Sequence, residues 1–125
     1  MPERGLSLQH TITIEAKLPS LNDYIKACRA NRYEGAEMKK DTERIISWFI
    51  ARLPRFEKPV EIHFHWIEGN KKRDVDNIAA GKKFVLDALV KAGKLKDDNR
   101  RCVVGFRDSF EYSDHFAVEV TITEV

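Results

Sequence analysis

The sequence has few residues that cross-link a chain or divide it into separate parts. Its 125 residues include two cysteines and four prolines, and no run of proline, glycine or serine is long enough to act as a linker. Cys28 and Cys102 lie far apart and belong to no Cys-x-x-Cys pair, which argues against a zinc site and against a disulfide-held secreted fold. We expect two free thiols and a single domain over residues 1–125.

Long apolar segments are also missing. No apolar run exceeds a handful of residues, which is too short to span a bilayer. The first residues, Met-Pro-Glu-Arg-Gly, contain neither an apolar signal core nor a cleavage motif. Because 42% of the residues are hydrophobic and 34% are charged, the composition is that of a globular protein. We therefore expect a cytoplasmic protein without a membrane partner.

The nearly balanced charge conceals a basic segment. The formal net charge is +2, yet residues 71–101 hold ten basic and five acidic side chains, so this segment carries +5 and the remainder −3. A positive zone in a nearly neutral chain can form a phosphate-binding surface. It can equally be a solvated helix face, and composition leaves both interpretations open.

Apolar periodicity predicts six elements. The alternation of apolar and polar residues indicates four strands, at positions 10–15, 60–66, 102–106 and 116–123. Helical spacing indicates two helices, over residues 36–53 and 75–92. Residues 18–33 are polar and basic and are predicted to form a surface loop, and residues 108–114 are predicted to close a hairpin. The order β-α-β-α-β-β favours a two-layer α+β fold, with two helices packed on one face of a mixed sheet.

Acidic side chains gather at the two ends of the second predicted helix. Asp74 and Asp76 lie at its start, and Asp97 and Asp98 follow a turn at Gly93. Residues at i and i+2 leaving an extended stretch project to the same side, so Asp74 and Asp76 point together. Clustered carboxylates raise one another's pKa unless a divalent cation neutralises them. Oxygen ligands select a hard ion such as Mg²⁺, which is suited to phosphodiester hydrolysis beside basic residues.

Each acidic motif also has a structural interpretation. The Asp-x-Asp-Asn sequence can cap the free N–H groups of a helix, and residues 97–99 can form a polar turn. An EF-hand loop starting at Asp74 is excluded, because its glycine position is Ala79 and its twelfth position is Val85. Spacing alone does not decide whether Asp98 reaches the first pair.

Two adjacent lysines lie on the same predicted helix. Asp76, Lys83 and Asp87 are spaced by seven and four residues, which places them on one helix face, with Lys83 about 10 Å above Asp76. Lys83 could bind a scissile phosphate or stabilise the charge of a transition state. It could also form an ordinary i, i+4 ion pair with Asp87. Lys82 points about 100° away, so spacing favours Lys83.

Taken together, these motifs resemble the RusA family of Holliday-junction resolvases. The family's Arg-Asp-x-Asp-Asn, Asp-Ala-Leu, Ala-Gly and Asp-Asp elements are similar to residues 73–77, 87–89, 92–93 and 97–98. Its Pro-Ser-x-Asn loop resembles residues 18–22, and its last strand resembles residues 118–123. The resemblance covers nearly the whole chain and is most specific between Arg73 and Asp98.

The resemblance implies a homodimeric, Mg²⁺-dependent endonuclease that resolves four-way DNA junctions by paired phosphodiester hydrolysis. Such enzymes act in recombination and repair, and their genes are often carried by prophages. Its metal-binding carboxylates fall on Asp74, Asp76 and Asp98, with Mn²⁺ as the alternative ion and no small-molecule cofactor. The family's lysine lies four residues after the second aspartate and four before the Asp-Ala-Leu aspartate. Here the spacing is three residues longer, so the first count gives Ala80 and the second gives Lys83.

Basic residues near these motifs are predicted to contact the DNA backbone, which positions a protein without reading sequence. These residues are Lys26, Arg29, Arg32, Lys71, Lys72, Arg73, Lys82, Lys94, Lys96, Arg100 and Arg101. Two other functions stay open: a module that binds branched DNA without cutting it, and a broader nuclease acting on flaps or forks. Cleavage of a junction with Mg²⁺ but not with EDTA would exclude the first.

Histidines and tryptophans give weaker signals. His63 and His65 share a strand face with Glu61 and could bind zinc, although strand alternation favours an ordinary exposed polar face. Trp48 and Trp66 are expected in the core or at a dimer face rather than in a base-stacking site.

Overall fold

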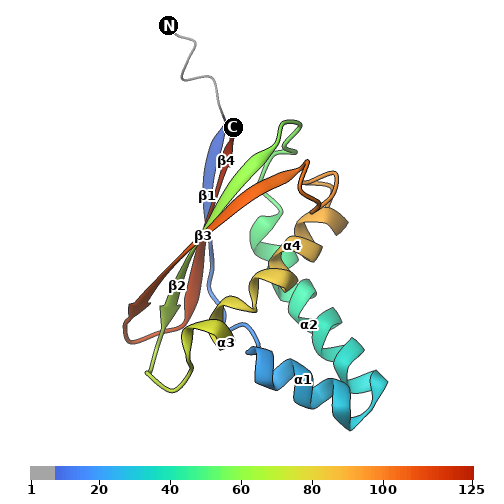
Figure 1. The fold of residues 1–125 in the computed structure, drawn as a ribbon, viewed down its shortest axis with the longest axis vertical. Coiled ribbons are helices and arrows are strands. Elements are labelled where there is room, and N and C mark those ends of the chain that lie inside the picture. Colours follow the sequence, from blue (N-terminus) through green and yellow to red (C-terminus); the bar gives the residue numbers. More distant parts are fainter. Residues whose placement is uncertain (1–7) are drawn as a thin grey trace, which may run out of the picture.

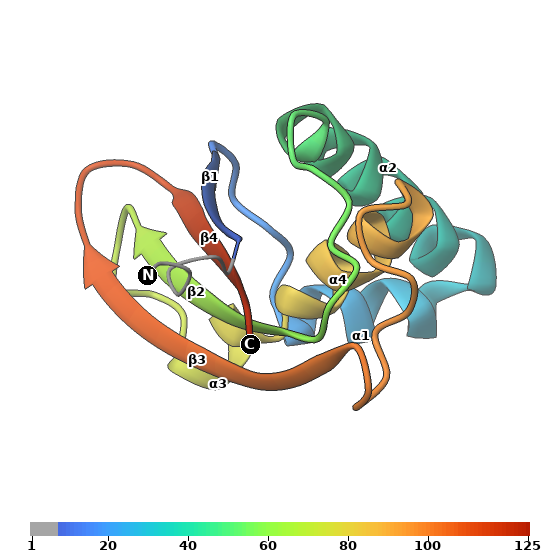
Figure 2. The ribbon, with the colours of Figure 1, turned by 90° about the horizontal axis from the view of Figure 1, so that it is seen from above.

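The chain folds into a four-stranded mixed sheet with its helices packed on one side (Figures 1 and 2). The structure is a computed structural model that describes residues 8–125, so the expectation about the first five residues concerns positions outside this range. The strands are β1 (Gln9–Ile14), β2 (Val60–Glu68), β3 (Val103–Tyr112) and β4 (Ala117–Glu124). Their order in the sheet is β1-β4-β2-β3; β2 and β3 are parallel, whereas β4 is antiparallel to both β1 and β2. The predicted α+β class and the mixed sheet are confirmed.

The predicted hairpin between the last two strands is wrong. β3 continues to Tyr112 rather than ending at Phe106, and it pairs with β2 in parallel. β4 pairs with the opposite edge of β2, so the connection from β3 to β4 passes the end of β2. Polar residues such as Arg107 and Ser109 lie among the aromatic residues of β3. The apolar residues of this segment are therefore too few to predict the second half of the strand.

The core lies between the helices and one face of the sheet. β2 and β4 supply its centre, with Phe64 and Ile122 fully buried, as the strict alternation of both strands predicted. Trp66 is 2% exposed, which confirms a core position. Trp48 is 81% exposed, so the core interpretation is wrong for this residue. The inward stripe of its helix runs through Ile46 and Ile50 instead.

Within residues 8–125, four helices connect the strands, where two were predicted. They are α1 (Leu21–Ala30), α2 (Arg32–Ile50), α3 (Val75–Ala79) and α4 (Lys82–Lys91). The predicted loop over residues 18–33 is wrong, because residues 21–30 form α1. A capping box starts this helix: the Asp23 N–H donates to Ser20 Oγ at 3.0 Å, and the Ser20 N–H donates to Asp23 Oδ2 at 3.1 Å. Ala27 is the buried residue of α1.

The second predicted helix is broken into α3 and α4 at Ala80 and Gly81. The backbone of Gly81 passes so near its neighbours that an added Cβ would lie 3.2 Å from Leu18 Cβ and 3.3 Å from the Trp66 ring. The Gly81 N–H donates to the Ile78 carbonyl at 3.1 Å, the i to i−3 pattern of a tight turn. The expected shared helix face of Asp76 and Lys83 is therefore wrong, because the two residues lie on different helices.

Two local expectations are confirmed. Gly93 ends α4 in the left-handed conformation with φ of 74°, which glycine adopts without steric cost. Cys28 and Cys102 are free thiols. None of the helices between residues 8 and 125 combines the length and the apolar character needed to cross a membrane.

Candidate active site

The scaffold of the site is an ion pair between Arg73 and Glu68. Arg73 donates from Nε and Nη2 to the two carboxylate oxygens of Glu68 at 2.9 and 2.7 Å. Its remaining Nη1 donates to the Leu18 carbonyl at 2.7 Å. The side chains of Arg73 and Glu68 are only 11% and 9% exposed. Arg73 therefore joins the end of β2, the acidic loop and the segment before α1, a structural role that the sequence did not indicate.

A second hydrogen bond joins the same two segments. Asn77 Oδ1 accepts the backbone N–H of Asn22 at 3.0 Å. Together with the bond from Arg73 to Leu18, it fixes the start of α1 against α3. The Leu-Pro-Ser-Leu-Asn and Arg-Asp-Val-Asp-Asn motifs, far apart in sequence, thus form one structural unit.

The two aspartates between Arg73 and Asn77 stay on the surface. Asp74 occupies the N-cap position of α3 with an extended backbone, but its side chain makes no cap hydrogen bond. Asp76 lies in the first turn, and its Oδ1 accepts the N–H of Asn77 at 3.0 Å. Both residues are exposed. The capping interpretation of Asp74 is therefore wrong.

Lys83 lies between two further aspartates. Its Nζ is 3.0 Å from Asp87 Oδ1 and 3.2 Å from Asp98 Oδ2. Hydrogen bonds to Asp87 and then Asp98 raise the pKa of Lys83 above its usual range, so the ammonium stays charged. The i, i+4 pair of Lys83 and Asp87 is thus present, and Asp98 joins it from the turn after α4.

The two members of the Asp-Asp pair have different partners. Asp97 accepts the Asp98 N–H at 2.7 Å and the Asn99 side-chain amide at 3.1 Å, so its carboxylate stabilises the turn. Asp98 instead contacts Lys83. The polar-turn interpretation therefore holds for Asp97 but does not account for the side chain of Asp98.

A metal site made of protein ligands alone would need several of these carboxylates to lie close together. Within residues 8–125, no group of three or more His, Cys, Asp or Glu side chains lies close enough to hold a metal ion. The predicted metal role of Asp74, Asp76 and Asp98 stays a prediction. Mg²⁺ often uses one or two protein carboxylates and completes its shell with water and phosphate oxygens, so the donor chemistry at Asp74 and Asp76 fits that ion.

The zinc alternative on β2 has no support from the described residues. His63 Nε2 and His65 Nδ1 lie 2.7 and 2.6 Å from Ser109 Oγ, and His65 Nε2 lies 2.8 Å from Glu111. These contacts form a hydrogen-bonded chain on the polar face of the sheet, which was the favoured interpretation.

Asp108 is a site neighbour that sequence reasoning missed. It binds Lys82 Nζ at 2.6 Å through one oxygen and the Trp66 indole N–H at 2.9 Å through the other. The Lys82 ammonium also lies 4.8 Å from the ring centre of Phe106. The available signal was the position of Asp108 midway between Phe106 and Phe110, which places the three side chains on one face of the strand. A carboxylate on an aromatic face indicates a polar partner nearby.

The predicted DNA-contacting residues divide into two groups. Arg73 and Lys82 are held in ion pairs, and Lys94 Nζ donates to the carbonyls of Ala51 and Leu53 at 3.0 and 2.6 Å. The other side chains are on the surface; they are Lys26, Arg29, Arg32, Lys71, Lys72, Lys96, Arg100 and Arg101. Any contact of the first group with DNA would compete with an existing partner.

Comparison with known proteins agrees with the motifs. A sequence model of the family described as Endodeoxyribonuclease RusA matches residues 4–123, which is nearly the whole chain. A search of curated proteins gives no match. The matched range contains all the acidic and basic residues discussed above, and on this basis the chain belongs to the RusA endodeoxyribonuclease family.

Proposed function

We propose that the protein is a Mg²⁺-dependent endonuclease that resolves four-way DNA junctions in recombination and repair. The observation that supports this most directly is that the side chains within residues 73–77 differ in what they contact. Arg73 and Asn77 use their side chains to hold the loop, whereas Asp74 and Asp76 remain exposed and Asp74 makes no cap bond. A capping motif would use its acids, and a metal-binding motif would leave them accessible.

The proposed roles follow from the chemistry of each side chain. Asp74, Asp76 and Asp98 would hold Mg²⁺, which when bound polarises a phosphoryl oxygen and lowers the pKa of a water molecule. Lys83 is protonated and its side chain is 66% exposed, so it can donate to a phosphate oxygen. Asp87, which lies one turn after Lys83 on α4 and pairs with it at 3.0 Å, would keep the ammonium in position.

We also propose that the protein acts as a homodimer. A four-way junction has two-fold symmetry at its exchanging strands, and a two-fold dimer would present two sites to two strands. Paired, symmetric nicks are the expected product. Sedimentation velocity on the full chain measures the oligomeric state directly.

The decisive experiment is cleavage of a synthetic four-way junction with Mg²⁺ and with EDTA. We expect Asp74→Asn, Asp76→Asn and Asp98→Asn to abolish cleavage while preserving or strengthening junction binding in EDTA, since each removes negative charge near phosphate. Asp41→Asn is the matched control, because Asp41 is an exposed acid on α2 in a surface ion pair. Full activity in any two of the three variants would remove the proposed metal site.

The same assay separates the alternatives and the two lysines. Binding without cleavage by the unmodified protein would identify a non-cleaving module, and equal cutting of flaps or forks would identify a broader nuclease. Lys83→Ala should slow cleavage more than Lys82→Ala. Lys82→Ala should instead lower the melting temperature, because it leaves Asp108 without its ammonium partner.

A further inference from the structure

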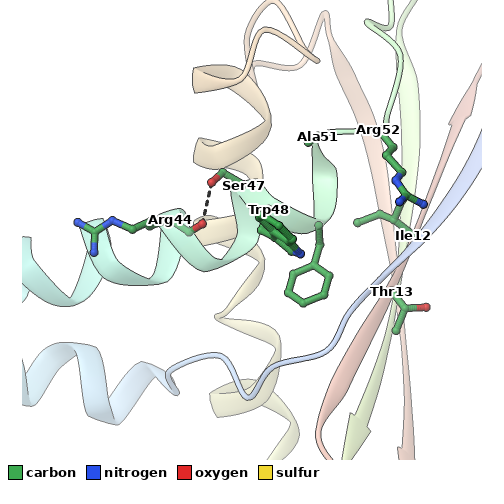
Figure 3. A pocket seen from close by; sticks show the side chains of 8 residues that line it. Ile12, Thr13, Arg44, Ser47, Trp48, Ala51 and Arg52 are labelled. Carbon is green, nitrogen blue, oxygen red and sulfur yellow. Dashed lines mark hydrogen bonds between the residues drawn. The ribbon is translucent and has the colours of Figure 1, made fainter.

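A groove unrelated to the acidic residues lies between the last turns of α2 and the edge strand β1 (Figure 3). Its volume is about 750 Å³, within the usual range of ligand sites. The lining residues are Ile12, Thr13, Arg44, Ser47, Trp48, Phe49, Ala51 and Arg52. The groove therefore combines apolar, aromatic and basic side chains at one edge of the molecule.

Trp48 is the most unusual residue of this groove. It is 81% exposed, whereas Trp66 is 2% exposed and has its indole N–H bonded to Asp108. A tryptophan face left in water forgoes a large hydrophobic gain, and such residues frequently mark interaction sites. Packing within the described chain does not explain why a tryptophan stands at this position.

Positive charge lies on both sides of the indole. Figure 3 shows Arg52 extending toward Ile12 on β1 and Arg44 extending along α2 in the other direction. Arg44 pairs with Asp41 at 3.2 Å, but both side chains are more than half exposed, so this pair holds the guanidinium only weakly. No carboxylate is among the described residues that line the groove.

We infer that this groove binds a single-stranded segment of DNA, with one base stacked on Trp48 and flanking phosphates contacted by Arg44 and Arg52. An aromatic platform beside cationic side chains is the general chemistry of sequence-tolerant single-strand binding. Guanidinium groups pair with phosphate through charge-assisted hydrogen bonds. The choice of DNA as the polymer rests on the proposed nuclease function, whereas the groove shares no residue with the proposed metal ligands Asp74, Asp76 and Asp98.

Charge argues against a second copy of the chain as the occupant. A two-fold contact is isologous, so a dimer centred on Trp48 would bring Arg44 and Arg52 of one protomer toward the same residues of the other. Like charges facing each other across an interface cost free energy and suppress association. A polyanion meets the same arginines with attraction.

Fluorescence of the full chain tests the inference without cleavage. The protein is titrated in EDTA and low salt with oligothymidylate, following tryptophan emission and the anisotropy of a labelled oligonucleotide. We expect the emission to be quenched on binding, and this quenching to be lost in Trp48→Phe, because Trp66 is buried. Trp48→Ala should weaken binding roughly 5- to 100-fold.

Two matched variants serve as controls. Ile45→Ala removes an apolar side chain of the same helix that is 49% exposed and lies outside the groove. Arg55→Ala removes an exposed guanidinium outside the groove and is compared with Arg52→Ala. We expect both controls to bind the oligonucleotide more tightly than their groove counterparts, which separates groove contacts from general charge.

Two results would overturn the inference. One is affinity for oligothymidylate in Trp48→Ala equal to that of the unmodified chain. The other is dissociation of a dimer by Trp48→Ala in sedimentation velocity with unchanged oligonucleotide affinity, which would assign the groove to a second copy. Because EDTA prevents metal-dependent cutting, failure of the proposed nuclease site would leave the fluorescence result unaffected, and the two failures are distinguishable.

Discussion

Asp87 shows how charge and burial act on one residue. Its partial burial raises the pKa, but hydrogen bonds from Lys39 and Lys83 outweigh this effect and lower the pKa below its usual range. Lys39 Nζ lies 3.0 Å from Asp87 Oδ2 and thereby joins α2 to α4. The same contact raises the pKa of Lys39, because the hydrogen bond to Asp87 favours the ammonium. Asp87 is therefore ionised and paired on both sides.

A pH dependence of stability follows from this shift. Because the pKa of Asp87 is lower in the folded than in the unfolded chain, its stabilisation is present above the unfolded value of about 4 and is lost as pH falls through the folded pKa. We expect Asp87→Asn to lower the free energy of unfolding at neutral pH and to have a much smaller effect below the folded pKa. Urea unfolding at both pH values measures this.

Asp41→Asn is the control for this prediction, since Asp41 carries the same charge in an exposed ion pair. An equal loss of stability in Asp87→Asn at neutral and acidic pH would contradict the ionic explanation. It would indicate that side-chain packing, rather than the charge of Asp87, stabilises the contact between α2 and α4.

For single residues, the sequence predicted those contacts and conformations that depend on spacing within one helix. The pair of Lys83 and Asp87 and the left-handed Gly93 both follow from positions within one helix. The contact of Lys82 with Asp108 was missed, because its partners are 26 residues apart and lie on a helix and a strand. Trp48 is exposed, so the core position predicted for it was wrong, whereas the alternative of a dimer face stays a prediction.

The secondary-structure elements show the same division. β2 and β4 were predicted well because each buries one face, and burial imposes an alternation that sequence displays directly. α1 was missed because only Ala27 is buried, although its Ser-x-x-Asp capping box was readable. The break between α3 and α4 depends on the close approach of Leu18 and Trp66 to Gly81. These contacts are distant in sequence, so apolar periodicity within the helix could not predict the break.

The pair of Glu68 and Arg73 joins the end of β2 to the acidic loop and to the segment before α1, and it gives a prediction for these elements. Glu68 is buried and the side chain of Arg73 is only 11% exposed, so removing one leaves the other charged and without a partner. We expect Glu68→Gln to reduce the free energy of unfolding by about 3 kcal/mol. A double-mutant cycle with Arg73→Gln should show that the double variant loses less than the sum of the single ones, measured by denaturant unfolding. Additive losses would mean that the two residues act independently.

The whole molecule has a small net charge but a strongly basic region, and its lysines differ in what they contact. Lys94 holds the carbonyls of Ala51 and Leu53 at the end of α2, whereas Lys96, two residues later, is exposed. The sequence analysis predicted both lysines as contacts of the DNA backbone, because both precede the Asp-Asp pair in the basic segment. The fold assigns the first to the scaffold, and we propose the second as a phosphate contact.

The salt dependence of junction binding tests this assignment. Each phosphate contact contributes about 0.9 to the slope of log affinity against log salt concentration, because binding releases condensed counterions. We expect Lys96→Met to reduce the slope by about this amount and to leave stability nearly unchanged. Lys94→Met should leave the slope unchanged and lower the free energy of unfolding by about 1 kcal/mol, because two carbonyls lose their donor. Binding is measured in EDTA over a series of salt concentrations. Equal slopes for the two variants would contradict this assignment, because they would show that Lys94 and Lys96 contribute equally to DNA binding.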